Sequence, residues 1–509
     1  MSFRQEYNGC KTYGCSNSGE PDFAHYSLSN RLGYPAWHCE LCGAYPPELL
    51  NPPILSLAEQ IQQRQFEPYF HCDNQRCDCQ RCDYQSHATW LRYGKTATGS
   101  QRVQCRECHK VKALPNPAAI TTTLQPLLDA LLSGVKPNHL QRQLGLSSKI
   151  FNQRLKQLAT LLTQFTRLHE QQHWQAPSPI TLQTRSHIQY CRSGLQRQQR
   201  SQKQSHAHVW TLATVDASTG YVYLISDNAL YPIDIADKEH HSSASHPGIQ
   251  GTHWLENSRY AQVHQEPDFS DEPDVLARAE KTYTKILARS QFDQLGYCLS
   301  IHASLGEGTL LRPVYAAHAH MQNLHQWLPS HTDINLLLEH ESFLRGAAMT
   351  AFSHSINHGT TSLYYWHLSC ANSQSNAQSD LGRSMSWWNE RWHQIELLRH
   401  NKQWQVGIGL LTPHKPKSIK AIYALFPNTL DGCHTFWQGF NGWLSPDVAT
   451  RMSIGKVHLW QQVYRYLYNA KLMKNKRNTL VYSPIDTSSI NNLVQCLNDS
   501  MIESKSSAF

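Results

Sequence analysis

Two sets of paired cysteines lie in the first 110 residues of this 509-residue chain. In the first set, a pair with four intervening residues is followed by a pair with two: Cys10, Cys15, Cys39 and Cys42. The same order of spacings returns at Cys72, Cys77, Cys105 and Cys108. Four thiolates delivered as two close pairs suit the tetrahedral coordination of structural zinc and leave no open position for chemistry. The pattern predicts two structural Zn²⁺ ions, held by tandem zinc ribbons.

The second ribbon has an alternative ligand set. Cys79 and Cys82 are also separated by two residues, and together with the later pair they would have an ordinary ribbon spacing. We favour Cys72 and Cys77 because they repeat the spacing of the first ribbon. The later pair, at 105 and 108, belongs to both sets.

Three carboxylates farther along the chain are placed as a catalytic metal site would require. Asp216 ends an apolar run just before a turn, and Glu341 follows the apolar run INLLL. The third acid is Glu390 or Glu396, in a segment (386–400) that reads as a helix. Two divalent ions about 4 Å apart can stabilise the attacking and leaving oxygens of a phosphodiester, and hard cations such as Mg²⁺ or Mn²⁺ bind carboxylates from separate elements. The three acids therefore predict a phosphoryl-transfer site if these elements converge.

Basic residues dominate the front half of the chain. Between Asp129 and Asp216 there are eleven Lys and Arg residues and one acid, Glu170, whereas residues 234–280 contain ten carboxylates. Residues 92–112 add six basic residues against one acid. A basic stretch of this kind is typical of a nucleic-acid surface. We expect double-stranded DNA as the partner, contacted by Lys95, Arg102, Arg106, Lys149, Arg154 and Lys156.

The segment 121–170 must position half of these basic residues. Leucines at three-and-four spacing predict a first helix, Pro137 suits the start of a second, Gly145 ends it, and Ser147 can cap a third. Helix, short turn, helix is the helix-turn-helix motif, whose second helix enters the major groove. Six residues would form its core: Leu140, Leu144, Leu146, Phe151, Leu155 and Leu158.

These elements indicate a multidomain protein with α+β and α/β parts. The predicted parts are a first ribbon at 1–50, a second ribbon at 69–114, a helix-turn-helix at 121–170, a mixed α/β core at 205–420 with an insertion at 228–273, and a helical, basic region at 421–509. Residues 51–68 read as a helical linker and residues 175–205 as a basic linker or edge hairpin. We expect the ribbons to present basic loops, such as Lys95–Arg106, beside the helix-turn-helix.

The order of these parts resembles bacterial insertion-sequence transposases of the DDE type. The resemblance rests on LGYPAWHCELCG, YGKTATGSQRVQCREC, SGVKPNHLQRQLGLSSKIFNQRL and TVDASTGYV. In addition, LEHESFLRGAAMTAF is similar to the family's second-acid region and VYRYLYNAKLMKNKRNTLVYSPID to its C-terminal segment. The family implies a ribonuclease-H-like core that cuts and joins DNA, with Mg²⁺ held by Asp216, Glu341 and Glu390, in a homo-oligomer on DNA.

Two functions follow from this resemblance. One is an active transposase; the other is a catalytically inactive, domesticated DNA-binding regulator. The chain departs from the family pattern at Glu341, which stands where an Asp is expected, and the extra methylene favours the inactive form because such sites are sensitive to small displacements. No apolar run reaches the ~18 residues of a membrane span and no apolar signal segment opens the chain, so we expect a cytoplasmic, nucleoid-associated protein without a membrane partner.

Overall fold

The computed structural model describes the chain over the ranges 3–29, 36–66, 70, 90–173, 179–192, 206–230, 309–328, 333–370, 391–399, 402–412, 431–475, 489–500 and 502. Five of the residues singled out above lie outside these ranges: Cys72, Cys77, Cys79, Cys82 and Glu390. Most of the insertion at 228–273 also lies outside them.

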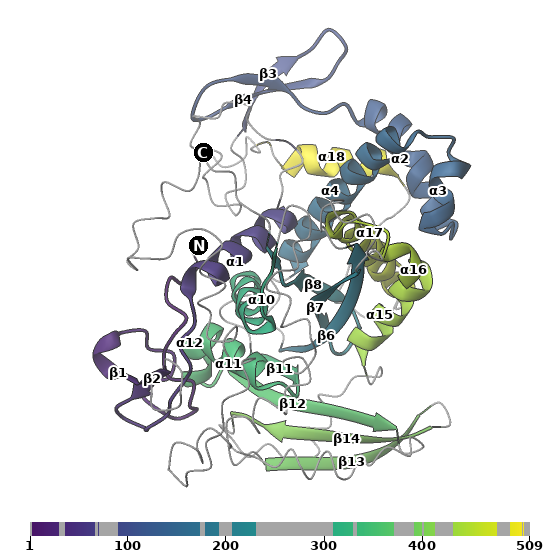
Figure 1. The fold of residues 1–509 in the computed structure, drawn as a ribbon. Helices are drawn as coiled ribbons and strands as arrows, with labels where there is room; N and C mark the ends of the chain where they lie inside the picture. The colour runs from purple at the N-terminus through teal and green to yellow at the C-terminus, as the bar shows by residue number, and fades with distance from the viewer. Residues whose placement is uncertain are drawn as a thin grey trace, which may run out of the picture.

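A mixed sheet of seven strands forms the centre of the described molecule, in the order β13-β14-β12-β11-β6-β7-β8 (Figure 1). Strands β6 (Ile180–Arg192), β7 (His206–Asp216) and β8 (Val222–Asp227) form an antiparallel meander, and β11 (Ile334–Glu339) runs parallel to both β6 and β12 (Thr361–Cys370). Strands β14 (Lys402–Leu410) and β13 (Arg391–Arg399) continue it antiparallel. A short pair, β9 (Ala229–Leu230) and β10 (Thr309–Leu310), lies outside this sheet. The chain therefore has the mixed α and β character expected from its sequence.

Strand β6 lies in the middle of the sheet, so the prediction of a linker or edge hairpin at 175–205 is wrong. The strand is polar, yet several of its polar side chains are buried, and some of these are hydrogen-bonded within the fold. Thr184 and Thr214 share a hydroxyl hydrogen bond of 2.7 Å, and the Gln183 side-chain carbonyl accepts from the Gly432 N–H at 3.0 Å. A strand satisfied in this way needs no apolar alternation, which is why its sequence does not read as a central strand.

The segment 386–400 was predicted to be a helix, and over its described residues, 391–399, this is also wrong. Residues 391–399 form the edge strand β13, paired with β14 along its length. Pairing with β14 satisfies backbone groups that would otherwise be open at the sheet edge, and this tertiary gain outweighs local helix propensity. Glu396 accordingly lies exposed on β13, where its carboxylate accepts a hydrogen bond from Gln403 at 2.7 Å.

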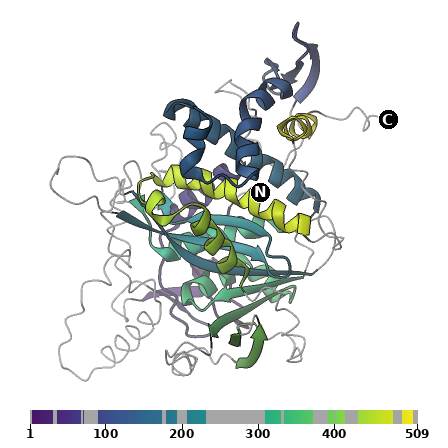
Figure 2. The same ribbon diagram turned by 90° about the vertical axis from the view of Figure 1, so that its right-hand side faces the viewer.

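Helices cover both faces of the sheet (Figure 2). One face packs against α1 (Asn51–Phe66), α10 (Pro313–Trp327), α11 (Ser342–Ala351) and α12 (Ser353–Asn357). The other packs against α15 (Gly432–Trp443), α16 (Pro446–Ala449), α17 (Ile454–Asn475) and the end of α4 (Ser148–His173). The sheet begins at Ile180 and its covering helices extend past residue 421, so the core spans more of the chain than 205–420.

The predicted helix-turn-helix region consists of α2 (Pro117–Leu132), α3 (Pro137–Gln143) and the first half of α4. Pro137 starts α3, and Gly145 leaves it with a φ of 61°, a value that favours glycine. The Ser147 hydroxyl accepts from the Ile150 N–H at 3.4 Å, which confirms the predicted cap. All six predicted core residues belong to one apolar cluster, and α18 (Ile490–Ser500) packs beside it on α2 and α4.

A buried ion network joins the end of α4 to the core. Glu170 pairs with Arg167 on its own helix and with Arg465 on α17, at 2.5 Å for the second pair. The Tyr221 hydroxyl donates to Glu170 at 3.0 Å, and Gln65 on α1 accepts from Arg167 at 2.6 Å. Glu170, the only acid between Asp129 and Asp216, is therefore 5 % exposed and withdrawn from the basic surface.

The two cysteine modules lie at different ends of the molecule (Figure 1). The first, with η1 (Phe23–His25), β1 (Tyr26–Ser29) and β2 (Ala36–Cys39), packs beside α11 and α12. The second, with β3 (Trp90–Lys95), β4 (Gln101–Cys105) and β5 (Val111–Ala113), leads directly into α2 and contacts the end of α18. Only the second module has the expected place beside the helix-turn-helix.

None of the helices in the described ranges is both long enough and apolar enough to cross a membrane.

Candidate zinc centre and nucleic-acid interface

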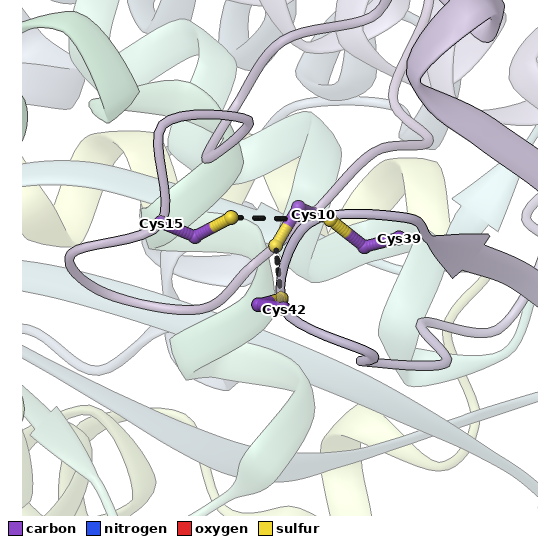
Figure 3. Close-up of side chains that lie close together, drawn as sticks. All are labelled: Cys10, Cys15, Cys39 and Cys42. Atoms are coloured by element: carbon purple, nitrogen blue, oxygen red, sulfur yellow. Dashed lines mark hydrogen bonds between the residues drawn. The ribbon is translucent and has the colours of Figure 1, made fainter.

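Four thiols of the first module converge on one point (Figure 3). The Sγ atoms of Cys10, Cys15, Cys39 and Cys42 all lie within 4.8 Å of one another. The Cys10–Cys42 separation is 3.5 Å and the Cys15–Cys39 separation is 3.9 Å. Thiolates bound tetrahedrally to zinc at about 2.3 Å would be about 3.8 Å apart. The four residues therefore fit a zinc ion in both donor chemistry and spacing.

A tight turn positions the second cysteine pair of this site. The Cys39 N–H donates to the Ala44 carbonyl at 2.8 Å, and the Gly43 N–H donates to the Cys39 carbonyl at 2.9 Å. Gly43 has a φ of 69°, which a residue with a β-carbon adopts only at a cost. Burial raises the pKa of the Cys39 thiol, but the N–H groups of Cys42 and Leu41 outweigh this and lower it to about 7. The turn thus favours the thiolate, which is the form that binds metal.

The turn from Cys105 to Lys110 has the same backbone hydrogen bonds. The Cys105 N–H donates to the Lys110 carbonyl at 3.0 Å, and the His109 N–H donates to the Cys105 carbonyl at 3.0 Å. His109 has a φ of 58°, the only positive φ of a non-glycine residue in the described chain, and it occupies the place of Gly43. Cys105 and Cys108 are therefore presented on a turn of the kind that presents the second pair of the first module. Their expected partners lie outside the described residues.

The first module is fixed to the core through residues near its N-terminus and through Ser18. Arg4 donates to the Thr350 carbonyl at 2.9 Å, and Asn357 donates to the Ser18 carbonyl at 3.4 Å. Tyr7 is fully buried in the main apolar cluster of the core. The module also carries more acidic than basic residues over 1–50. Its location and charge make it a structural part of the core more than a DNA contact.

Asp216 lies at the end of β7, as predicted, where it organises the hairpin turn. Its Oδ1 accepts from the N–H groups of Ser218 at 2.8 Å and Thr219 at 2.7 Å, and from both hydroxyls. Gly220 completes the turn with a φ of 78°. This carboxylate is therefore engaged in a turn typical of Asp before a hairpin.

Glu341 lies at the opposite end of the sheet from Asp216. Asp216 pairs with Leu182 on β6, and Leu182 pairs with Leu336 on β11, whereas Glu341 follows the far end of β11. With strands about 4.8 Å apart and about 3.3 Å per residue, the Cα atoms of Asp216 and Glu339 are about 14 Å apart. Glu341 is buried at the start of α11, where its carbonyl accepts from the Leu344 N–H at 3.1 Å. The structure does not bring Asp216 and Glu341 together, and Glu396 lies three strands away from β11.

An arginine occupies the carboxylate-rich end of β11. Arg185 on β6 pairs with Glu339 at 3.6 Å and with Asp431, which caps α15 by accepting from the His434 N–H at 2.8 Å. Burial lowers the pKa of Arg185, but the carboxylates of Asp431 and Glu339 outweigh it and raise that pKa. Burial also raises the pKa of Glu339, against the opposing effects of Arg185 and Ser186. One guanidinium thus pairs with both acids.

No family model, curated protein or solved structure matches this chain. What can be said of its function therefore rests on its own residues. Within the described ranges, the four thiols are the only group of three or more His, Cys, Asp or Glu side chains close enough to share a metal ion.

The six candidate DNA contacts lie on two neighbouring elements. Lys149 and Lys156 are exposed on the first half of α4, where Arg154 is half-buried. Lys95 and Arg106 are exposed on the β3–β4 hairpin and the turn after it. Arg102, also on β4, lies over the ring of Tyr93 with its Cζ 5.4 Å from the ring centre. The basic residues thus reach the surface from the second module and from the helix that follows α3.

Sequence reasoning missed Arg185 and Asp431. Arg185 was hidden because β6 was read as a linker, and Asp431 because it belongs to a turn before α15. The available signal was Asp431 directly before a helical run, which is typical of an N-cap. Glu339 directly follows the run INLLL in the sequence, but the pairing of Glu339 with Arg185 depends on the parallel register of β6 and β11, which no local pattern encodes.

Proposed function

We propose that this protein is a sequence-reading DNA-binding protein with the architecture of a transposase, in which the core is a non-catalytic scaffold. The observation that carries the proposal is the composition of the helix-turn-helix surface. Residues 130–166 contain five basic residues and no acid, and the next two charged residues, Arg167 and Glu170, are buried together in an ion network. Duplex DNA would meet an uninterrupted positive surface, which favours binding through counterion release.

The proposal includes a ribonuclease-H-like core and tandem zinc ribbons. The antiparallel meander that continues into two parallel strands, covered by helices on both faces, supports a ribbon-bearing protein with a ribonuclease-H-like core. The repeated turn at Cys105 supports a second structural zinc ion and hence tandem ribbons. We further propose a homo-oligomer on DNA and a cytoplasmic, nucleoid-associated location, since both follow from the transposase resemblance.

The carboxylates favour the inactive regulator over the active transposase. A two-metal site needs carboxylates from neighbouring elements within a few ångströms of both ions. Strand β6, which lies beside β11, carries no Asp or Glu, and its Arg185 already pairs with Glu339 and Asp431. A guanidinium that already pairs with both carboxylates competes with a divalent cation for them.

DNA binding tests the proposal. We expect the purified protein to bind duplex DNA with an affinity that falls steeply as salt rises. Lys149→Gln and Lys156→Gln should each reduce the slope of log K against log salt by about 1, because each removes one phosphate contact. The control is Lys471→Gln, an exposed lysine on α17 outside the two basic elements, which should leave the slope unchanged. Binding without salt dependence, or equal effects of all three substitutions, would contradict the proposal.

Active transposition is the second candidate, favoured by two acids at the end of β11, the partly buried Glu339 and the buried Glu341. In that case Asp216, Glu341 and Glu390 would hold Mg²⁺ or Mn²⁺, which would activate water and then a 3′-hydroxyl for attack on a phosphodiester. We expect instead no nicking or strand transfer of flanking DNA with either ion. Metal-dependent nicking that Asp216→Asn abolishes would establish the catalytic function and refute the inactive scaffold.

A further inference from the structure

Ile150 is an exposed apolar residue on the first turn of α4. Its side chain is 44 % exposed, and its neighbours three, four and seven residues along the helix are polar or basic: Gln153, Arg154 and Gln157. Positions at this spacing share one helix face, so these side chains form a single stripe. An isolated β-branched side chain therefore stands at the start of a polar stripe that includes Arg154, one of the proposed DNA contacts.

The core beneath α4 is complete without Ile150. Phe151, Leu155 and Leu158 lie on a different face of the helix and are at most 3 % exposed. They pack with α2 and α3 in one cluster, which does not include Ile150. The isoleucine thus adds nothing to this core, although its exposure to water is unfavourable.

The first turn of α4 is held in a fixed orientation. The Ser147 hydroxyl accepts from the Ile150 N–H, and Gln141 on α3 donates to the Ser148 hydroxyl at 2.9 Å. The far end of the same helix is anchored through Glu170. A side chain carried on so constrained a turn can read shape and chemistry precisely enough for recognition.

The major groove offers one apolar group that matches such a side chain. Thymine alone among the four bases presents a C5-methyl group there, and side-chain amides such as that of Gln153 pair with adenine. The N-terminal residues of a recognition helix are the ones that reach base edges. We propose that Ile150 contacts a thymine methyl group, which makes the DNA site of this protein depend on a T·A pair at that position. This inference rests on the proposed DNA-binding function.

Thymine-to-uracil replacement tests it directly, because it removes only the methyl group. Duplexes are first selected from a random library with the full chain, and each thymine of the selected site is then replaced in turn by deoxyuridine. For the wild type we expect one position at which affinity falls about fourfold, the effect of one buried methyl group. Ile150→Ala should bind the thymine and uracil duplexes equally, whereas Ile150→Val, which keeps branched methyl groups, should retain the difference.

Leu132→Ala is the matched control. Leu132 is 42 % exposed at the end of α2, outside the stripe, and its replacement should leave the thymine preference intact. The inference is overturned if the wild type has no uracil-sensitive position, or if Ile150→Ala keeps one. Failure of the wild type to bind any DNA would overturn the proposed function as well, so the two failures are distinguishable.

Discussion

Replacing Cys39 by serine should remove one zinc ion per chain and unfold the first module. The turn that holds Cys39 lowers the pKa of its thiol to about 7, and a serine hydroxyl cannot substitute for the thiolate as a zinc ligand. Structural zinc contributes on the order of 10 kcal/mol or more to the folding of small modules, so three remaining thiols will not hold this one together. Zinc content measured after exhaustive dialysis is the direct test.

The effect should extend beyond the module because Arg4 and Tyr7 connect it to the core. Hydrogen exchange should therefore rise in α11 and α12 as well as over residues 3–50. Cys496→Ser is the control, since Cys496 is half-buried on α18 and lies outside the thiol cluster. Unchanged zinc content in the Cys39 variant would exclude the site. Faster exchange confined to 3–50 would show that the module does not support the core.

Replacing Glu170 by glutamine should destabilise the protein by about 3–5 kcal/mol. Such a cost is typical of removing one partner from a buried ion pair, because the remaining charge is left uncompensated. Here two guanidinium groups are left, those of Arg167 and Arg465, both at most 4 % exposed. Burial already lowers the pKa of Arg167 to about 10 despite the opposing effect of Glu170. Urea unfolding followed by circular dichroism gives the free energy of unfolding.

Asp129→Asn is the matched control for Glu170→Gln. Asp129 is an exposed acid on α2, and its neutralisation should change the free energy of unfolding by less than about 0.5 kcal/mol. Each substitution removes one negative charge and so raises the net charge of the protein by one. An effect of net charge alone would therefore be equal in the two variants. Equal free energies would mean that the network does not hold α4 to the core.

The elements predicted best from the sequence are those determined by interactions between residues that are close in the chain. The bounds of α3 and the start of α4 follow from Pro137, Gly145 and Ser147, each of which acts within its own turn. The first zinc set follows from spacing, because four thiolates at such intervals have few other uses. The hairpin after Asp216 was also predictable from the sequence, since a carboxylate before a turn accepts hydrogen bonds from the next residues.

The predictions that were wrong concern elements whose structure depends on partners far away in the sequence. A polar strand such as β6 becomes central only because Thr214 and Gly432 satisfy it, and they lie far away in sequence. The edge strand β13 formed because β14 offered open backbone groups. The catalytic interpretation required Asp216 and Glu341 to lie close together. The strand register instead places Asp216 level with Leu336 and Glu341 beyond the far end of β11, and no local pattern encodes register.

Because α4 is continuous, it fixes the orientation of the proposed DNA-binding surface relative to the core. One unbroken helix of 26 residues, about 39 Å long, begins at the proposed DNA surface and ends among the buried charges of the core. Since α4 has no break between the proposed DNA surface and the core, the orientation of the sheet would determine the direction of a bound duplex. In a homo-oligomer, the distance between two recognition helices would then be set by how the cores associate. Such an assembly would tolerate only one spacing between half-sites, and inserting half a turn of DNA, about 5 base pairs, would place the second half-site on the wrong side of the duplex.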